Sequence, residues 1–265
     1  MKAIIVRELK AGRKSMLIWM AGMLFMVAIG AAEYGTVVGN AEDIMPMMDM
    51  LPRIVRVIFG MDILPVTTPL GYYVCMYLWY AIVAFAHAAV LGATIIAKEE
   101  KNRTAEFIFT MPYSRQVIIT GKIIAAVLNT LAMTIFTFIC IVTTLVSQMS
   151  GPSILPQILL TMVGMFFAQL MFLALGLLFS AVFKSHRAAL SLSVGLMIFT
   201  YVLAVIIEFG GGMAFLDILT PFRYFFAPTV VESGISLMFL LLSLIVVGVS
   251  GFFTYRLYEK RDIHC

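Results

Sequence analysis

Six long apolar stretches constrain the fold of this chain more than any other feature of its sequence. They cover about residues 16–38, 72–97, 121–147, 154–183, 188–207 and 235–256. A helix of roughly 20 apolar residues crosses the hydrocarbon core of a bilayer. Because no water is available there to pair with backbone groups, such segments must be helical. The sequence therefore predicts an all-α polytopic membrane protein, with six transmembrane helices in a single transmembrane domain that covers 1–265.

The composition agrees with this class and argues against others. Hydrophobic residues make up 62% of the chain and charged residues 12%, and the mean hydropathy is +1.05. The net charge of +4 does not indicate a nucleic-acid partner. The basic residues lie beside the apolar stretches, where membrane proteins concentrate them. We therefore expect a lipid bilayer around the chain and no nucleic acid.

The distribution of basic residues predicts the orientation. Of the 18 Lys and Arg residues, 15 lie in the segments 1–15, 98–122, 184–187 and 256–265. The positive-inside rule places such segments in the cytoplasm. We expect a multi-pass protein of the cell membrane with both termini cytoplasmic. The segments 39–71 and 208–234 are expected to form short helices that cap the bundle on the other side.

The first fifteen residues have the pattern of a basic amphipathic helix. At 100° per residue, one face holds Ile5, Leu9, Gly12 and Met16, and the opposite face holds Arg7, Lys10 and Lys14. A helix of this kind lies in the membrane interface, with its basic face toward anionic headgroups. We expect an interfacial helix over 1–15 before the chain turns into the first span. A plain basic tail is the alternative.

Motifs for catalysis are missing or incomplete. The sequence contains no GxxxxGK[ST] phosphate loop, no HExxH metal motif and no GxSxG elbow. The chain itself is therefore not expected to be an enzyme, to hydrolyse ATP or to bind a metal or cofactor. Glu99 and Glu100, followed by Arg103, come close to the EExxxR motif of intramembrane proteases, although the arginine is one residue early. An intramembrane metal-dependent protease that uses these two carboxylates is one alternative.

The charged segment 98–122 contains an apolar patch made by Phe107, Ile108 and Met111. Its acidic start is typical of the first turn of a helix, Pro112 ends that helix, and Ser114 is placed to cap the next one. An apolar centre with a charged rim of Arg103, Glu106 and Arg115 is typical of a docking surface. An amphipathic helix in the lipid headgroups fits these residues equally well.

The string of Glu100, Thr104, Glu106, Pro112, Ser114, Arg115, Gly121 and Lys122 resembles the signature of ABC-2-type permeases. These are the membrane subunits of ATP-binding-cassette exporters. The family pattern runs E-x-x-x-G-T-x-E, P-x-S-R and G-K after the second of six spans, as here. Arg103 departs from it, because the family usually has glycine before the threonine. The resemblance implies the ABC-2 (type V exporter-like) topology.

The resemblance also implies partners and site residues. It makes 98–120 a cytoplasmic coupling helix segment that docks on a separate ABC ATPase, of which two copies bind ATP and Mg. A second permease copy, identical or different, is implied as well. The docking residues would be Glu99, Glu100, Arg103, Thr104, Glu106, Phe107, Ile108, Met111, Pro112, Ser114 and Arg115.

Polar residues inside the spans are candidates for the transport pathway or the dimer seam. They are Asn129, Thr130, Thr134 and Thr137 on the third span and Gln169 on the fourth. Small and hydroxyl residues also serve ordinary helix packing. The spans hold no cluster of acids, so we expect an amphipathic or hydrophobic cargo, such as a peptide, a drug or a lipid-like molecule. The resemblance implies that the cargo is exported. A membrane anchor or sensor that does not transport is the remaining alternative.

Overall fold

The computed structural model describes residues 1–61, 63–96, 114–149, 153–183, 185–210 and 214–259, and within these ranges it contains helices and turns but no strand. Six helices are long and apolar enough to cross a membrane. They are α1 (Lys2–Gly39), α4 (Pro69–Ile95), α7 (Arg115–Cys140), α8 (Leu155–Val182), α9 (His186–Phe209) and α12 (Leu237–Glu259). The predicted all-α polytopic fold with six spans is confirmed.

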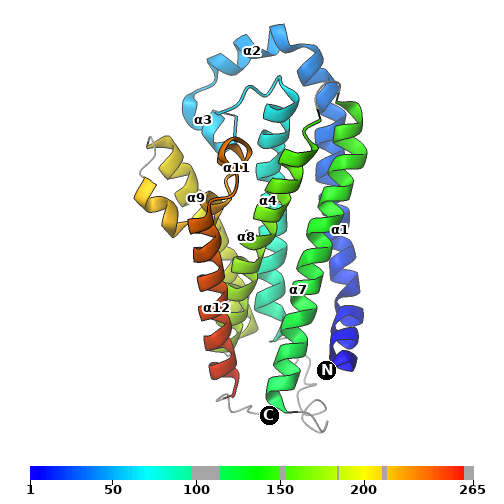
Figure 1. Cartoon of the computed structure of the whole chain (residues 1–265), viewed down its shortest axis with the longest axis vertical. Coiled ribbons are helices and arrows are strands. Elements are labelled where there is room, and N and C mark those ends of the chain that lie inside the picture. Colours follow the sequence, from blue (N-terminus) through cyan, green and yellow to red (C-terminus); the bar gives the residue numbers. More distant parts are fainter. Residues whose placement is uncertain (62, 97–113, 150–152, 184, 211–213, 260–265) are drawn as a thin grey trace.

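The six long helices form an elongated bundle with two different ends (Figure 1). We call the end where α1 begins and α12 ends the terminal end. The other end, the cap end, carries the short helices α2 (Ala41–Met50), α3 (Arg53–Ile58) and α11 (Ala227–Ser233). A 3₁₀ helix (Ala214–Leu219) and α10 (Pro221–Tyr224) precede α11. The sequence predicts short helices in both of these connecting segments.

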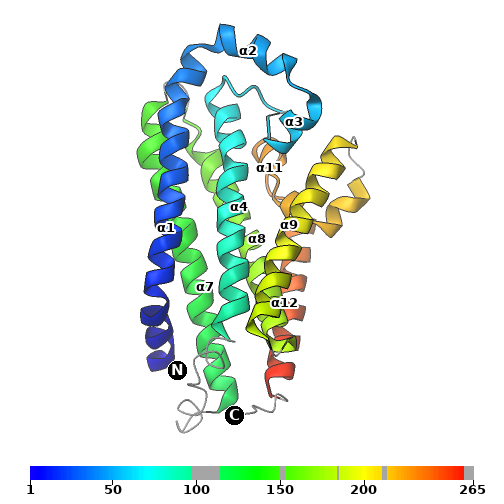
Figure 2. The same cartoon turned by 180° about the vertical axis from the view of Figure 1, so that it is seen from behind.

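Helices α4 and α8 form the centre of the bundle, with α1 and α7 on one side and α9 and α12 on the other (Figures 1 and 2). The two central helices approach each other closely because glycines face each other. A Cβ added at Gly92 of α4 would lie 2.3 Å from the Leu173 carbonyl oxygen, and one at Gly176 of α8 would lie 2.7 Å from the Ala89 carbonyl oxygen. Small residues allow helix backbones to pack in this way inside a membrane.

Several long helices begin at a hydroxyl residue that caps their first turn. Thr68 accepts a hydrogen bond from the Gly71 amide at 3.1 Å, and Ser114 accepts one from the Val117 amide at 3.4 Å. Each bond satisfies an amide that the helix itself leaves unpaired. The predicted N-cap at Ser114 is confirmed. At its other end α7 continues through a π-helical turn (Ile141–Leu145) and a 3₁₀ turn (Val146–Gln148).

The expected break between an interfacial helix over 1–15 and the first span is wrong, because α1 runs without interruption from Lys2 to Gly39. Ile4, which lies outside the predicted apolar face, is buried beside Ile118 and Gly121 of α7. The residues of the predicted face, Ile5, Leu9, Gly12 and Met16, are half-buried. No proline interrupts the helix, and its first turns are held against α7. The basic residues of the opposite face are exposed, as the helical wheel predicts.

Candidate functional site

Most predicted docking residues fall outside the described residues. These are Glu99, Glu100, Arg103, Thr104, Glu106, Phe107, Ile108, Met111 and Pro112, and with them the two carboxylates of the protease alternative. Ser114 and Arg115 are described and lie at the start of α7. Arg115 Nη1 donates to the backbone oxygen of Glu259 at 3.4 Å, and the Gln116 amide donates to the carboxylate of the same residue. The start of α7 is thereby joined to the end of α12.

The chain leaves α4 and enters α7 at the terminal end (Figure 1). Lys122, about two turns into α7, reaches across to α4 and donates from Nζ to the Ile95 carbonyl oxygen at 3.0 Å. That carbonyl belongs to the last residue of α4. One side chain therefore fixes the two helix ends that flank residues 97–113.

Lys122 also forms an ion pair with Glu8 of α1. Its Nζ lies 3.2 Å from Glu8 Oε1, and the two side chains are 1% and 7% exposed. Removing two charges from water is costly, and their mutual attraction and extra hydrogen bonds must offset that cost. The Ile95 carbonyl supplies such a bond. The result is a three-helix junction of α1, α4 and α7 around one ammonium group.

Sequence reasoning missed this junction. Lys122 was recognised only as the last residue of the family signature, and Glu8 belongs to no motif. One signal was available: Glu8 is the sole acidic residue among the first 15, which include five basic residues. It lies at the edge of the apolar helical face. An acid in that position indicates a buried partner, but the sequence does not say which of the 18 basic residues it meets.

A cavity of about 290 Å³ adjoins the ion pair. Helices α1, α4, α7 and α9 surround it. Its polar lining consists of Glu8, Ser15, His87, Thr94, Asn129 and His186. Of the five residues predicted for the pathway or the dimer seam, Asn129 lines this cavity, and its Nδ2 donates to the Ala125 carbonyl oxygen at 3.1 Å.

His87 is the most buried polar group of the cavity, with 3% of its side chain exposed. Its ring meets the indole of Trp19 edge to face, with the two centroids 5.7 Å apart. Its Nδ1 is buried and has no hydrogen-bond partner among the described residues. A buried polar atom without a partner is unfavourable, and His87 is one of the residues that line the cavity.

The other four predicted pathway or seam residues lie inside the bundle rather than on its surface or in the cavity. Thr130, Thr134, Thr137 and Gln169 are buried between α7 and its neighbours. Thr134 Oγ1 donates to Gln169 Oε1 at 2.7 Å, which joins α7 to α8. The other two hydroxyls donate to backbone oxygens one turn earlier in α7, Thr130 at 3.0 Å and Thr137 at 2.8 Å.

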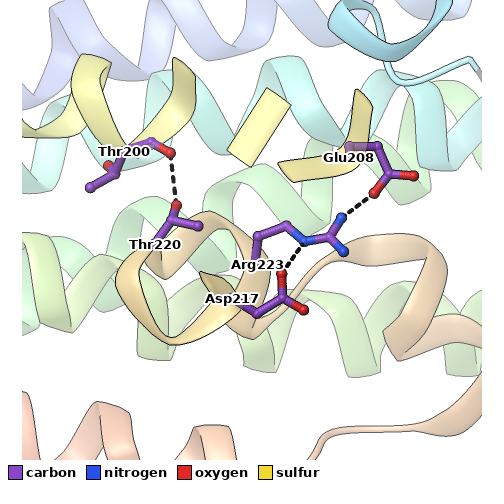
Figure 3. Close-up of polar contacts among 5 residues, drawn as sticks. All are labelled: Thr200, Glu208, Asp217, Thr220 and Arg223. Atoms are coloured by element: carbon purple, nitrogen blue, oxygen red, sulfur yellow. Dashed lines mark hydrogen bonds and ion pairs between the residues drawn. The ribbon is translucent and has the colours of Figure 1, made fainter. Parts of the chain in front are cut away.

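The cap end has its own polar cluster, which Figure 3 shows. Arg223 of α10 pairs with Glu208 at the end of α9 and, from Nε, with Asp217 at 3.0 Å. Thr220 Oγ1 donates to the Thr200 carbonyl oxygen at 2.7 Å. These contacts join the 3₁₀ helix and α10 to α9. The sequence predicts short helices here but does not single out this cluster.

The bundle defines an all-helical, multi-pass membrane protein with a polar cavity and a buried ion pair toward its terminal end. A model of the family described as ABC-2 family transporter protein matches residues 2–263. The chain therefore belongs to the ABC-2 family of transporter proteins, and the resemblance carried by its charged segment is confirmed. No curated protein matches the chain.

Family membership makes the chain a membrane component of an ABC transporter rather than a catalytic subunit. It also implies association with an ABC ATPase subunit.

Proposed function

We propose that this chain is the permease subunit of an ABC exporter that moves an amphipathic or hydrophobic cargo. Two permease copies, identical or different, work with two copies of a separate ATPase, which bind ATP and Mg. Both termini and the segment 98–120 lie in the cytoplasm, and this segment docks on the ATPase through the residues named above. The match to the ABC-2 family supports the proposal.

The three-helix junction is the observation that carries this proposal. A coupling segment transmits force only if its ends are fixed to the helices that must move. Lys122 joins the end of α4, the start of α7 and α1, and Arg115 joins the start of α7 to the end of α12. A pull on residues 98–120 then moves four helices together at the terminal end.

The proposed motion would change the shape of the cavity beside the junction. Its walls come from α1, α4, α7 and α9. A shift of α1 and α7 relative to α9 changes its width, which is how two access states of a transporter differ. We assign Asn129 to the cargo pathway because it lines this cavity. We assign Thr130, Thr134, Thr137 and Gln169 to helix packing because they are enclosed between helices of this chain.

The docking claim is tested by co-purification. The permease carrying Phe107→Asp and Met111→Asp is co-expressed with its ATPase, and the ATPase recovered per permease is measured. We expect recovery to fall at least about tenfold, since two charges would enter an apolar contact, each at a cost above about 1.4 kcal/mol, which corresponds to tenfold in affinity.

The matched control places the same substitutions at the other end of the bundle. Met47 and Phe215 are 66% and 70% exposed and lie in the cap-end segments. The variant with Met47→Asp and Phe215→Asp should retain the ATPase. Equal recovery from both double variants would contradict docking through 98–120.

A further inference from the structure

The polar cavity at the terminal end has the features of a built binding site. It is lined by residues of four helices, it has a volume of about 290 Å³, and its lining includes His87, whose buried Nδ1 has no partner among the described residues. That volume is near the lower end of the range for small-molecule pockets. It is far larger than a metal ion needs, and one carboxylate falls short of the six or more oxygen ligands of Ca²⁺.

The charge that faces the cavity is negative. Glu8 lines it, whereas Lys122 lies behind the carboxylate and is not part of the lining. The contact to Lys122 uses Oε1, and a carboxylate has acceptor positions left for further donors. The indole of Trp19 also lines the cavity, and its face attracts cations. These groups favour a positively charged guest over an anion.

The remaining groups favour a guest that carries N–H donors and an apolar tail. His87 Nδ1 accepts a hydrogen bond when its imidazole is neutral and that nitrogen is unprotonated. The Asn129 side chain is a second polar group on the α7 side. The walls between these groups are apolar and include Met16, Val90 and Leu91. A protonated amine with a short alkyl chain satisfies both parts of the lining.

We propose that this cavity binds the protonated amine of an amphipathic cargo, with Glu8 as its counter-ion, Trp19 and His87 as its neighbours and the alkyl part against α1 and α4. This names the substrate class of the proposed exporter and to that extent rests on the proposed function. The ion pair then has two roles, because the carboxylate that anchors α1 to α7 also contacts the guest.

The test uses Trp19 as the reporter. The chain has two tryptophans, and the second, Trp79, contacts Phe59 at a centroid distance of 5.6 Å and does not line the cavity. The full chain with Trp79→Phe is reconstituted in lipid nanodiscs without ATPase. It is titrated at pH 7 with n-hexylammonium, with n-hexanol and with hexanoate, which share one chain length and differ in charge.

We expect a saturable change in Trp19 fluorescence with n-hexylammonium, at concentrations at least tenfold below those required for n-hexanol, and none with hexanoate. An equal response to the three compounds would show partition into the lipid and overturn the proposal. The absence of a saturable response to n-hexylammonium would overturn it as well.

Two glycines of α1 supply matched variants. A Cβ added at Gly12 meets only the Asn129 Nδ2, at 4.0 Å, so Gly12→Leu extends into the cavity without a backbone clash. A Cβ added at Gly22 meets nothing within 4 Å. Gly12→Leu should weaken n-hexylammonium binding at least tenfold, and Gly22→Leu should leave it unchanged. Equal affinities of the two variants would overturn the assignment to this cavity.

The role of the carboxylate is tested with both charges removed, so that no buried charge remains unpaired. Glu8→Gln with Lys122→Gln should bind n-hexylammonium and n-hexanol with similar affinity. Retention of the tenfold preference would show that Glu8 is not the counter-ion. This assay contains no ATPase, so a chain that fails it but still co-purifies with the ATPase overturns the amine site alone. Loss of the ATPase with intact amine binding overturns the docking claim alone.

Discussion

The ion pair between Glu8 and Lys122 gives the sharpest test of how the terminal end is held together. At 3.2 Å between Nζ and Oε1, Coulomb attraction at an effective dielectric constant of about 20 amounts to roughly 5 kcal/mol. Removing one partner leaves the other charge buried, which costs about 3–5 kcal/mol. We therefore expect Lys122→Met and Glu8→Gln each to lower the free energy of unfolding by about 3–5 kcal/mol.

The double variant behaves differently. Replacing both members of a buried pair by groups of similar volume is often neutral or stabilising. Glu8→Gln with Lys122→Met should therefore be more stable than either single variant, by about 2–4 kcal/mol. The hydrogen bond to the Ile95 carbonyl is lost in this variant and is worth about 1 kcal/mol.

The assay is equilibrium unfolding of the full chain in mixed micelles, for the parent, both single variants and the double variant. If a single variant does not accumulate, the yield of folded protein from the double variant still reports the rescue. Single losses below about 1 kcal/mol that add up in the double variant would refute the reasoning, because they would show that the two charges are solvated rather than coupled.

Three further contacts lead to direct predictions. Gly92→Ala should cost about 2 kcal/mol or more of unfolding free energy, because its Cβ would lie 2.3 Å from the Leu173 carbonyl oxygen; Gly195→Ala, with nothing within 4 Å, is the control. Ser114→Ala should cost up to about 1 kcal/mol through the lost cap of α7, whereas Ser114→Asp should not. Arg223→Gln leaves the carboxylates of Glu208 and Asp217 without their shared cation, so amide exchange over 214–233 should accelerate while α4 is unchanged; equal acceleration in both would contradict this.

Apolar length and helix caps made the fold predictable from sequence. A stretch of about 20 apolar residues has one stable conformation in a bilayer, so each of the six spans is recognisable by itself. Ser114 marks the start of α7, because its hydroxyl caps an amide in the first turn of the same helix. The start of α1 was harder to predict, because the helical wheel shows which face of 1–15 is apolar but not whether lipid or protein contacts it.

The site was less predictable because its groups come from separate helices. Glu8 and Lys122 are 114 positions apart, and neither local pattern names the other. His87 and Asn129 stand out as polar residues in apolar spans, but only packing decides that both face one cavity. Thr134 has the same appearance in the sequence as Asn129, and packing instead gives it a bond to Gln169.

The contact at the three-helix junction is polar and directional, and this matters more for the coupled movement of the helices than for stability. An apolar side chain in place of Lys122 would fill the space among α1, α4 and α7, but it would let the helices slide past one another, since apolar contacts are not directional. The ammonium group instead holds one carboxylate and one carbonyl at fixed distances of 3.2 and 3.0 Å. A displacement of the start of α7 must then carry α1 and the end of α4 with it or break a buried charge contact. The variant with Glu8→Gln and Lys122→Met is therefore expected to fold and to bind its ATPase. That complex should nevertheless hydrolyse ATP without coupled transport.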